Sequence, residues 1–412
     1  MEVVHEPQFL KRVLLAFRFQ WQFMDALIQA RVWALRRTDR LNPFERIVTS
    51  RPPAIAGKEY RDPRGRYLLT RFRPPPTVLE RRRPVVLVPG FSMSTYWFRA
   101  DTPRGNITEF LLANGHEVWL LDYRASDRLN ASLDQFTLDD LATSDFPAAI
   151  EEVSTRTDQS VHIIAHCVGS ISILMSLLSG KLAGRGVHSI ILSQAFAFID
   201  QPFTNRLKAK MRLAEMLRLI GFQPMLTPDF DLRSSLAVRL LDRLLYFYPS
   251  RERCKSGVCR RLLLIYGDAN RHDQLDGVTH EKIYDMVDRG NLTTLAQLEK
   301  MAVRRKLVNA QGKDIYVTPD NGKNVNVPVT LLQGERNNLF RRSGAVKTLA
   351  WLHQYGGFGS REHNQEQFTL VPLTGYGHMD VFIGRNSAGY VYPKILEALR
   401  QMESSSGNHR ES

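Results

Sequence analysis

The sequence predicts an α/β fold with a mostly parallel central sheet, helices on both faces of the sheet, and a helical lid insertion. From residue 84 onward, short apolar runs of strand length alternate with segments of helical periodicity. Alternating strands and helices imply a parallel sheet covered on both faces. The alternation stops between residues 200 and 311 and then resumes, which indicates an insertion above the sheet. With 412 residues, 43% of them hydrophobic, the chain can bury a core of this size.

The elements are expected where apolar runs meet turn and cap residues. Residues 85–88 (VVLV) end in Pro-Gly, as a buried strand does, and residues 161–165 (VHIIA) run into a His-Cys-Val-Gly turn. Residues 137–155 are an expected helix with Thr137 and Asp139 as candidate caps. The other expected strands are residues 67–72, 117–123, 189–193, 327–333 and 367–373, and the other expected core helices are residues 107–113, 170–178, 343–354 and 390–402.

This pattern divides the chain into five segments. Residues 1–50 form an N-terminal amphipathic helical segment, and residues 51–199 form the first part of the α/β core. Residues 200–311 form the helical lid, whose leucines and aromatic residues are expected to cover an apolar pocket. Residues 312–402 complete the core, and residues 403–412 form a disordered polar tail.

The N-terminal segment and the net charge bear on location and partners. Residues 9–37 place apolar side chains at helical spacing opposite basic ones, which suits either an anionic membrane interface or docking on the core, and we favour docking. Their apolar runs are too interrupted for a spanning helix or a signal peptide. A net charge of +14 favours anionic partners, yet no nucleic-acid-binding motif is present. We expect a cytoplasmic protein that does not bind nucleic acid and makes at most peripheral membrane contact; the oligomeric state stays open.

Three cysteines are too few for a disulfide framework. Cys254 and Cys259 stand in CKSGVC, whose spacing is interpreted as fitting no common zinc site, and no paired Cys/His set accompanies them, so we expect two unrelated thiols. His272 and His280 belong to a polar cluster of the lid whose spacing is not that of a motif such as H-E-x-x-H. We therefore expect no metal and no cofactor, and a reducing compartment.

Cys167 occupies the position of a nucleophile. A buried strand runs into it and a helix follows at once, which is the layout of a nucleophile elbow with the pattern G-x-S-x-G. Ala165 takes the place of the first glycine, Cys167 that of the serine, and Gly169 that of the last glycine. At a helix N-terminus the partial positive charge favours a thiolate, so we expect Cys167 to be reactive.

The general base is expected to be His378, which follows the last predicted strand in the segment GYGHMD. The residue that orients it is expected after the preceding strand, where QGERNN places Asn337. Its amide oxygen can accept the Nδ1–H bond, as in the Cys-His-Asn arrangement. Glu335 and Asp268 remain rival candidates for this third position.

The oxyanion hole requires two backbone N–H donors. Val168, directly after the cysteine, offers one of them. The loop after the first core strand offers the other at Phe91, and Gly90 before it lets a substrate approach the backbone closely.

These residues resemble the α/β-hydrolase superfamily, and the segments VPGFSMS, AHCVGSIS, YGDANRHDQLDGVTH, LLQGERNNLF and GYGHMDVFIG carry the likeness. Within it, the chain resembles the hydrolase domains attached to some cholesterol-oxidase-like glucose–methanol–choline oxidoreductases, although no GxGxxG motif follows a first strand here. The resemblance implies an α/β-hydrolase fold and lipid-like substrates. A cysteine in this position is also similar to polyhydroxyalkanoate synthases, from whose aspartate Asn337 departs.

The sequence thus predicts an esterase or acyl hydrolase that acts on a carboxylic ester or thioester of a hydrophobic acid. Cys167, His378 and Asn337 would form the triad, and an acyl-thioester intermediate would follow from sulfur as nucleophile. An acyltransferase with an alcohol or hydroxyacyl acceptor is the first alternative. A non-catalytic binding protein with this fold is the second.

Overall fold

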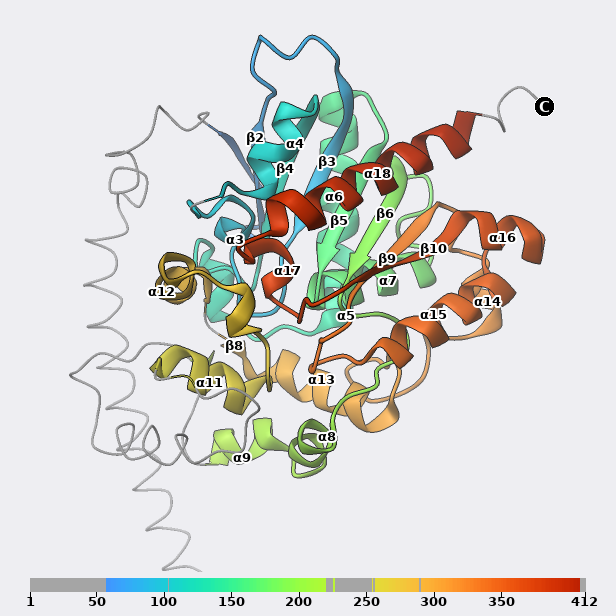
Figure 1. Ribbon diagram of the computed structural model, residues 1–412. Coiled ribbons are helices and arrows are strands. Elements are labelled where there is room, and N and C mark those ends of the chain that lie inside the picture. The colour runs from blue at the N-terminus through green and yellow to red at the C-terminus, as the bar shows by residue number, and fades with distance from the viewer. Residues whose placement is uncertain are drawn as a thin grey trace, which may run out of the picture.

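The computed structural model describes residues 57–102, 104–219, 225–226, 254, 256–288 and 290–407. Within these residues a twisted sheet is flanked by helices, and a group of further helices lies across one end of it (Figure 1). The expected amphipathic segment 1–50 lies outside the described residues, as do residues 408–412 of the expected tail. None of the helices in the described ranges is both long and apolar enough to cross a membrane.

The eight-stranded sheet has the order β1-β2-β4-β3-β5-β6-β9-β10. β2 pairs antiparallel with β1 and with β4, and every other pairing in this sheet is parallel. The predicted fold class, a mostly parallel sheet of the α/β-hydrolase type, is confirmed. Its strands are β1 Lys58–Arg61, β2 Tyr67–Phe72, β3 Arg82–Val88, β4 His116–Tyr123, β5 Val161–His166, β6 Val187–Ser193, β9 Val329–Gly334 and β10 Phe368–Leu373.

The central strands are apolar because helices cover both of their faces. All residues of β5 and β9 are buried, as is the second half of β3. Such strands read as continuous apolar runs, which is why the sequence located them. β1 was not predicted: KEYR is a short edge strand with mostly exposed side chains, so it carries no apolar signal.

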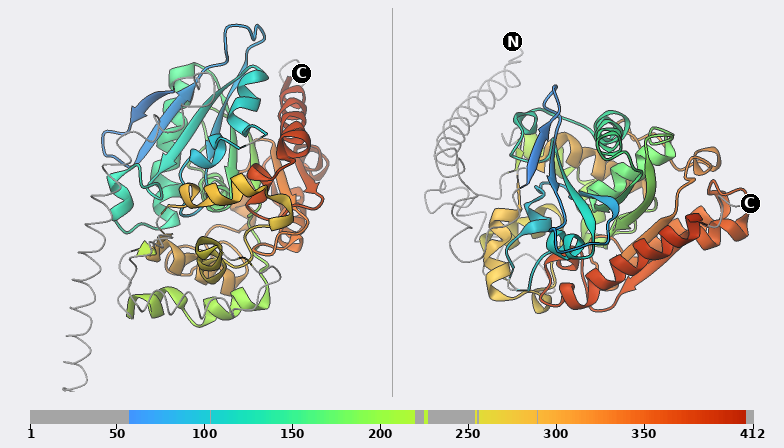
Figure 2. Two further views of the ribbon diagram at one scale, coloured as in Figure 1. Left: turned by 60° about the vertical axis from the view of Figure 1, so that its left-hand side comes forward. Right: turned by 90° about the horizontal axis from the view of Figure 1, so that it is seen from above.

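Helices pack against both faces of the sheet. α4 (Ile107–Ala113) and α18 (Ser387–Gly407) lie together on one face, and α6 (Phe146–Thr157) and α7 (Val168–Leu178) lie together on the other (Figure 2). The remaining helices of the core are α3 Tyr96–Arg99, α5 Leu138–Asp140, α14 Pro319–Gly322, α15 Arg342–Tyr355, α16 Arg361–Gln367 and α17 Asp380–Ile383, with the 3₁₀ turn η1 Asn130–Leu133 and the π-helical turn η2 Leu141–Asp145.

α18 extends to Gly407 and so includes residues 403–407 of the expected tail. At its Glu403 the Oε1 atom lies 3.1 Å from Nε2 of the buried His162, which joins this part of the helix to the sheet.

The lid is inserted between β6 and β9 and lies across the ends of the parallel strands (Figure 1). Its helices do not bury their apolar sides against one another alone: α13 packs on α8 and α9, and α12 contacts α3 of the core. The described lid elements are α8 Phe203–Lys210, α9 Leu213–Leu219, β7 Met225–Leu226, α11 Gly257–Ile265, η3 His272–Gln274, α12 Gly277–Met286, β8 Gly290–Asn291 and α13 Leu292–Arg304.

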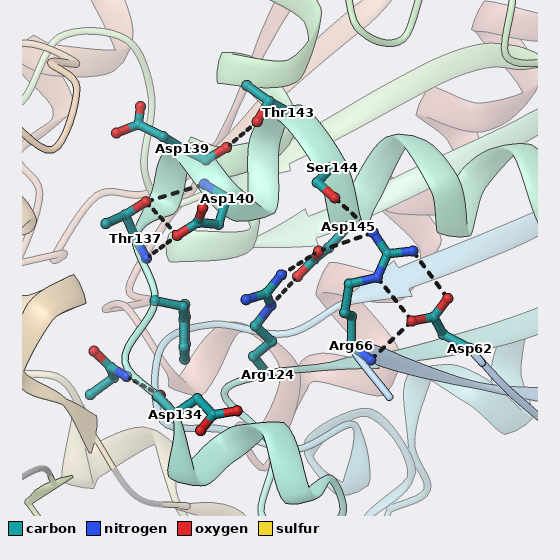
Figure 3. Close-up of polar contacts among 12 residues, drawn as sticks. Asp62, Arg66, Arg124, Asp134, Thr137, Asp139, Asp140, Thr143, Ser144 and Asp145 are labelled. Carbon is teal, nitrogen blue, oxygen red and sulfur yellow. Dashed lines mark hydrogen bonds and ion pairs between the residues drawn. The ribbon is translucent and has the colours of Figure 1, made fainter. Parts of the chain in front are cut away.

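The buried carboxylate of Asp145, at the end of η2, links this turn to Arg66 and Arg124, which lie next to strands β2 and β4. Asp145 is fully buried and accepts bonds of 2.6 and 2.9 Å from the Nε and Nη2 atoms of Arg124. Arg66 approaches it to 3.8 Å and is itself bonded to Asp62 and to Ser144 (Figure 3). Burial raises the pKa of Asp145, and the hydrogen bonds from Arg124 oppose that rise. Asp145 therefore depends on Arg124 to remain charged inside the protein.

We expect Arg124→Ala to lower the free energy of unfolding by about 3 kcal/mol, because it leaves the buried carboxylate of Asp145 without its bidentate partner. Urea unfolding followed by circular dichroism measures the change. Lys323→Ala is the matched control, since its ion pair with Asp320 is solvent-exposed and is worth less than about 1 kcal/mol. Equal losses in the two variants would contradict the assignment.

Candidate active site

The turn between β5 and α7 holds Cys167 in a strained backbone conformation. Its φ of 54° and ψ of −118° are unfavourable for a residue with a side chain. Two hydrogen bonds hold the turn: the Cys167 N–H donates to the Ser193 carbonyl at 2.9 Å, and its carbonyl accepts from Ile171 at 3.1 Å as α7 begins. The elbow expected from the sequence is therefore present, with the cysteine at its tip.

Gly169 is required by the close approach of α7 to β3. A Cβ at this position would lie 2.6 Å from the Pro89 carbonyl oxygen and 2.9 Å from that of Val88. No side chain fits there, which explains the glycine of the elbow motif. Gly90 is similarly close to the cysteine, because a Cβ there would lie 3.0 Å from the Cys167 Cβ.

The two expected oxyanion-hole donors, Phe91 and Val168, lie beside the cysteine. The backbone N–H groups of both residues lower the pKa of the Cys167 thiol, because they favour its ionised form. The loop that carries Phe91 is fixed from below, since Tyr123 donates to the Gly90 carbonyl at 2.8 Å. It is fixed from the lid as well: Tyr266 donates to Ser92 Oγ at 2.7 Å. The sulfur thus marks a place where two N–H groups converge.

His378 and Asn337 are brought together as expected. His378 is buried on the loop after β10, and Asn337 is buried on the loop after β9. The Asn337 Nδ2 lies 3.1 Å from the His378 Nδ1. The Phe340 ring lies 5.5 Å from the imidazole.

The direction of this hydrogen bond differs from the expectation. The Asn337 Oδ1 already accepts the backbone N–H groups of Leu339 and Phe340, at 2.9 and 3.0 Å. Its Nδ2 also donates to Gln194 Oε1 at 2.9 Å. Gln194 cannot turn over freely, because the same Oε1 accepts the Gly334 N–H at 3.0 Å.

The amide of Asn337 is therefore fixed with its NH₂ group toward the ring, and the predicted acceptance of Nδ1–H by its oxygen is wrong. A neutral His378 that accepts at Nδ1 carries its proton on Nε2.

The rival candidates for the third position do not contact His378. Glu335 is exposed and pairs with Arg342 at 3.4 Å. Asp268 accepts a 3.4 Å bond from the side chain of Asn338. Asn337 is the one of the three that reaches the imidazole.

Burial shifts the pKa of both side chains toward their uncharged forms. Burial raises the pKa of the Cys167 thiol to about 12, although the two backbone N–H groups oppose the rise. Burial, together with the neighbouring His166, holds the pKa of the His378 imidazole well below its ordinary value. Desolvation of the sulfur opposes the helix dipole and the two N–H groups, so the expected thiolate at Cys167 stays a prediction.

Sequence reasoning missed three buried residues that shape the site. Gln194, directly after β6, adopts a φ of 73° and fixes Asn337. His166 places its ring 4.9 Å from that of His378 and has its pKa lowered to about 3 by burial. Asp380 accepts the N–H of Gly377 at 2.7 Å and so fixes the loop of the histidine. His166 and Asp380 stand next to the motif residues, whereas Gln194 gave no signal beyond a polar residue after a strand.

An apolar pocket opens onto the sulfur. Its cavity volume is about 90 Å³, and both Cys167 and His378 line it. The lid supplies most of its wall, through Leu213, Leu262, Ile265, Leu295 and Leu298 among others. The elbow, the histidine loop and the lid therefore meet at one cavity.

The interpretation of Cys254 and Cys259 as unrelated thiols is contradicted. Ligand atoms of Cys254, Cys259, His272 and His280 all lie within 4.8 Å of one another. The four intervening residues between the cysteines lie within the spacing that structural zinc sites use, and only the histidine spacing, with seven intervening residues, is longer. Folding of the lid, not the linear motif, brings these side chains together.

Cys167 lies in a strained elbow at the end of a central parallel strand, and His378 lies on the loop after the edge strand β10. This arrangement places the protein in the class of α/β-hydrolase-fold enzymes. The chain belongs to the alpha/beta hydrolase family, which matches residues 85–378. That membership is consistent with the expected esterase or acyl hydrolase. A comparison with curated proteins found no match. The more specific likenesses, to oxidoreductase-attached domains and to polyhydroxyalkanoate synthases, stay predictions.

Solved structures share the fold at low identity. A soluble variant of Saccharomyces cerevisiae monoglyceride lipase, in complex with a substrate analogue, is 14% identical with a TM-score of 0.50, and the match covers 86% of this chain and 97% of that one. DcsB in complex with its substrate analogue is 14% identical with a TM-score of 0.50, covering 84% and 99%. Paleococcus ferrophilus monoacylglycerol lipase is 13% identical with a TM-score of 0.45, covering 84% and 99%. These similarities establish the fold alone.

The raised pKa makes the reactivity of Cys167 depend on pH. Because that pKa is about 12, the thiolate fraction and hence the rate of alkylation by iodoacetamide should rise about tenfold per pH unit between pH 6 and 9. Mass spectrometry of the peptide that contains Cys167 measures the rate. The same peptide in urea-unfolded protein is the control and should level off above about pH 9. Fast, pH-independent alkylation of the folded protein would instead reveal a thiolate–imidazolium pair.

Proposed function

We propose that this protein hydrolyses carboxylic esters or thioesters of hydrophobic acids, with Cys167 as the nucleophile. One observation carries the proposal: a strained backbone holds the Cys167 sulfur at an apolar pocket, beside the N–H groups of Phe91 and Val168. A cysteine that only filled the core would not need a positive φ, whereas a nucleophile must stand clear of its strand.

The reaction follows from the positions of these groups. The sulfur attacks the carbonyl carbon, the S–C bond forms, and the thiol proton passes to His378. The N–H groups of Phe91 and Val168 hold the oxyanion. The bond to the alcohol or thiol then breaks, and the leaving group takes the proton from His378. Water attacks the thioester, gives a proton to the ring, and releases the acid as the proton returns to sulfur.

In this mechanism the amide of Asn337 hinders the first proton transfer, from the thiol to His378. With its Nδ2 donating to Nδ1, the neutral ring carries its proton on Nε2 and has no lone pair there to accept one. Acylation therefore requires the ring to exchange its proton between the two nitrogens. We infer that the enzyme is slow with activated esters and depends on substrate binding to populate the reactive tautomer.

The pocket favours an apolar acyl group. Its lining is dominated by leucine, isoleucine, alanine and aromatic side chains from the lid and the core. Burial also raises the pKa of Glu299 in its wall to about 7, so this carboxyl loses part of its charge. Lys208, whose pKa burial lowers to about 8, is the only other Lys, Arg, Asp or Glu side chain in the described part of the wall, so side chains of these types interrupt the apolar lining at two places.

A panel of p-nitrophenyl esters of increasing chain length tests the proposal. We expect kcat/KM to rise with chain length as apolar surface is buried, and intact mass to show one acyl group on Cys167. Cys167→Ala should abolish both signals, and His378→Ala should lower kcat/KM about 10²- to 10⁴-fold.

Adding an alcohol to the same assay shows whether water or the alcohol accepts the acyl group. Product that is mainly free acid supports hydrolysis, and product that is mainly the new ester assigns the protein as an acyltransferase. If Cys167 takes up no acyl group and is no more reactive toward the esters than Cys254 or Cys259, the protein is a non-catalytic binding protein of this fold.

We expect Asn337→Asp to raise kcat/KM about 10- to 100-fold. A carboxylate keeps the acceptor bonds from Leu339 and Phe340 and accepts a proton at His378 Nδ1, which frees Nε2 as the base. Its other oxygen replaces the NH₂ group that donates to Gln194 Oε1, so we also expect the variant to be less stable than the parent protein. Asn338→Asp is the matched control, because it adds the same charge one residue away from the amide that contacts the ring. An unchanged or lower rate in Asn337→Asp, with the fold intact by circular dichroism, would show that the amide does not limit catalysis.

A further inference from the structure

Four side chains of types that commonly bind metals lie close together in the lid. None of them lines the apolar pocket beside Cys167. The Nε2 atom of His280 lies 3.3 Å from the sulfur of Cys254 and 3.3 Å from that of Cys259. The ring of His272 lies 5.2 Å from that of His280. One ligand atom from each of the four lies within 4.8 Å of all the others.

This spacing matches a tetrahedral ion. With Zn–S bonds of about 2.3 Å and Zn–N bonds of about 2.0 Å, the sulfur–nitrogen edge of a zinc tetrahedron is about 3.5 Å. The two distances from His280 lie close to that edge. Two thiolates and two imidazoles are also the donor set of closed structural zinc sites.

The four side chains come from separate pieces of the lid. Cys259 lies on α11, His272 on η3 and His280 on α12, while Cys254 precedes α11. The elements α11, η3 and α12 make few contacts with one another, so a metal ion bound by all of them would hold them together. A lone cysteine pair or a lone histidine pair would join fewer of them.

The same pieces hold both loops of the candidate active site. Next to η3, the Arg271 N–H donates to Asp380 at 3.2 Å, and the Ala269 carbonyl accepts from Met379 at 2.9 Å. After α12, the Asp288 N–H donates to the Ser92 carbonyl at 2.7 Å. A fixed lid therefore fixes the histidine loop and the oxyanion loop together.

We propose that Cys254, Cys259, His272 and His280 bind one zinc ion that fastens the lid over the acyl pocket. Binding releases the two thiol protons to solvent, and the two thiolates balance the 2+ charge of the ion. No open coordination position remains for water, so the ion is structural and takes no part in acyl transfer.

The metal content of the full-length protein tests the proposal without any substrate. Protein purified without chelator should contain about one zinc per chain by mass spectrometry of the elements. Cys254→Ser and His280→Ala should lower this to less than about a fifth, and His280→Cys should restore it, because a third thiolate replaces the imidazole. Cys167→Ser is the matched control and should keep the full zinc content, although it removes the proposed nucleophile.

A second measurement does not depend on whether the ligand variants fold. In Cys167→Ser, Cys254 and Cys259 are the only cysteines left. Cobalt(II) added after removal of zinc should give thiolate-to-metal charge transfer and the intense visible bands of a tetrahedral site. Two results overturn the proposal: absence of zinc together with absence of these bands, or a Cys254–Cys259 disulfide seen as a two-hydrogen mass loss. Neither result tests the function proposed for Cys167, because the metal is measured in a variant that lacks this cysteine.

Discussion

The close approach of α7 to β3 is the constraint on which the site depends. Gly169 has no side chain because the carbonyl oxygens of Val88 and Pro89 occupy the space that one would need. That approach forces Cys167 into the left-handed region, and the bond from its N–H to Ser193 holds it there. The strain is local, and the buried sheet around it supplies the stability that tolerates it.

The surroundings of Cys167 and His378 favour the uncharged form of each side chain. Desolvation raises the pKa of the thiol and lowers that of the imidazole. Asn337 also favours the neutral imidazole, because its Nδ2 donates to His378 Nδ1, an atom from which a carboxylate would accept a proton. In the proposed mechanism Phe91 and Val168 already lie beside the sulfur as oxyanion donors, so proton transfer is the step on which these surroundings act.

The lid is a structural part of the site as well as its cover. It forms most of the wall of the acyl pocket, and its backbone bonds reach the loops of Phe91 and His378 from opposite sides. A lid of short helices has little core of its own. The Cys/His cluster lies where cross-linking its pieces would stabilise this arrangement most directly.

The sequence by itself predicted the parallel sheet and the elbow at Cys167, because buried strands and the turns that end them have local patterns. It also placed His378 and Asn337 after the last two strands of this sheet. Only the tertiary structure decided which way the Asn337 amide faces, because Gln194, Leu339 and Phe340 fix it from separate segments. The direction in which the pKa of Cys167 shifts depends on the structure as well, because elements distant in sequence desolvate the sulfur. The Cys/His cluster was hidden for the same reason: its members belong together in space, and their spacing along the chain reflects only the length of the lid between them.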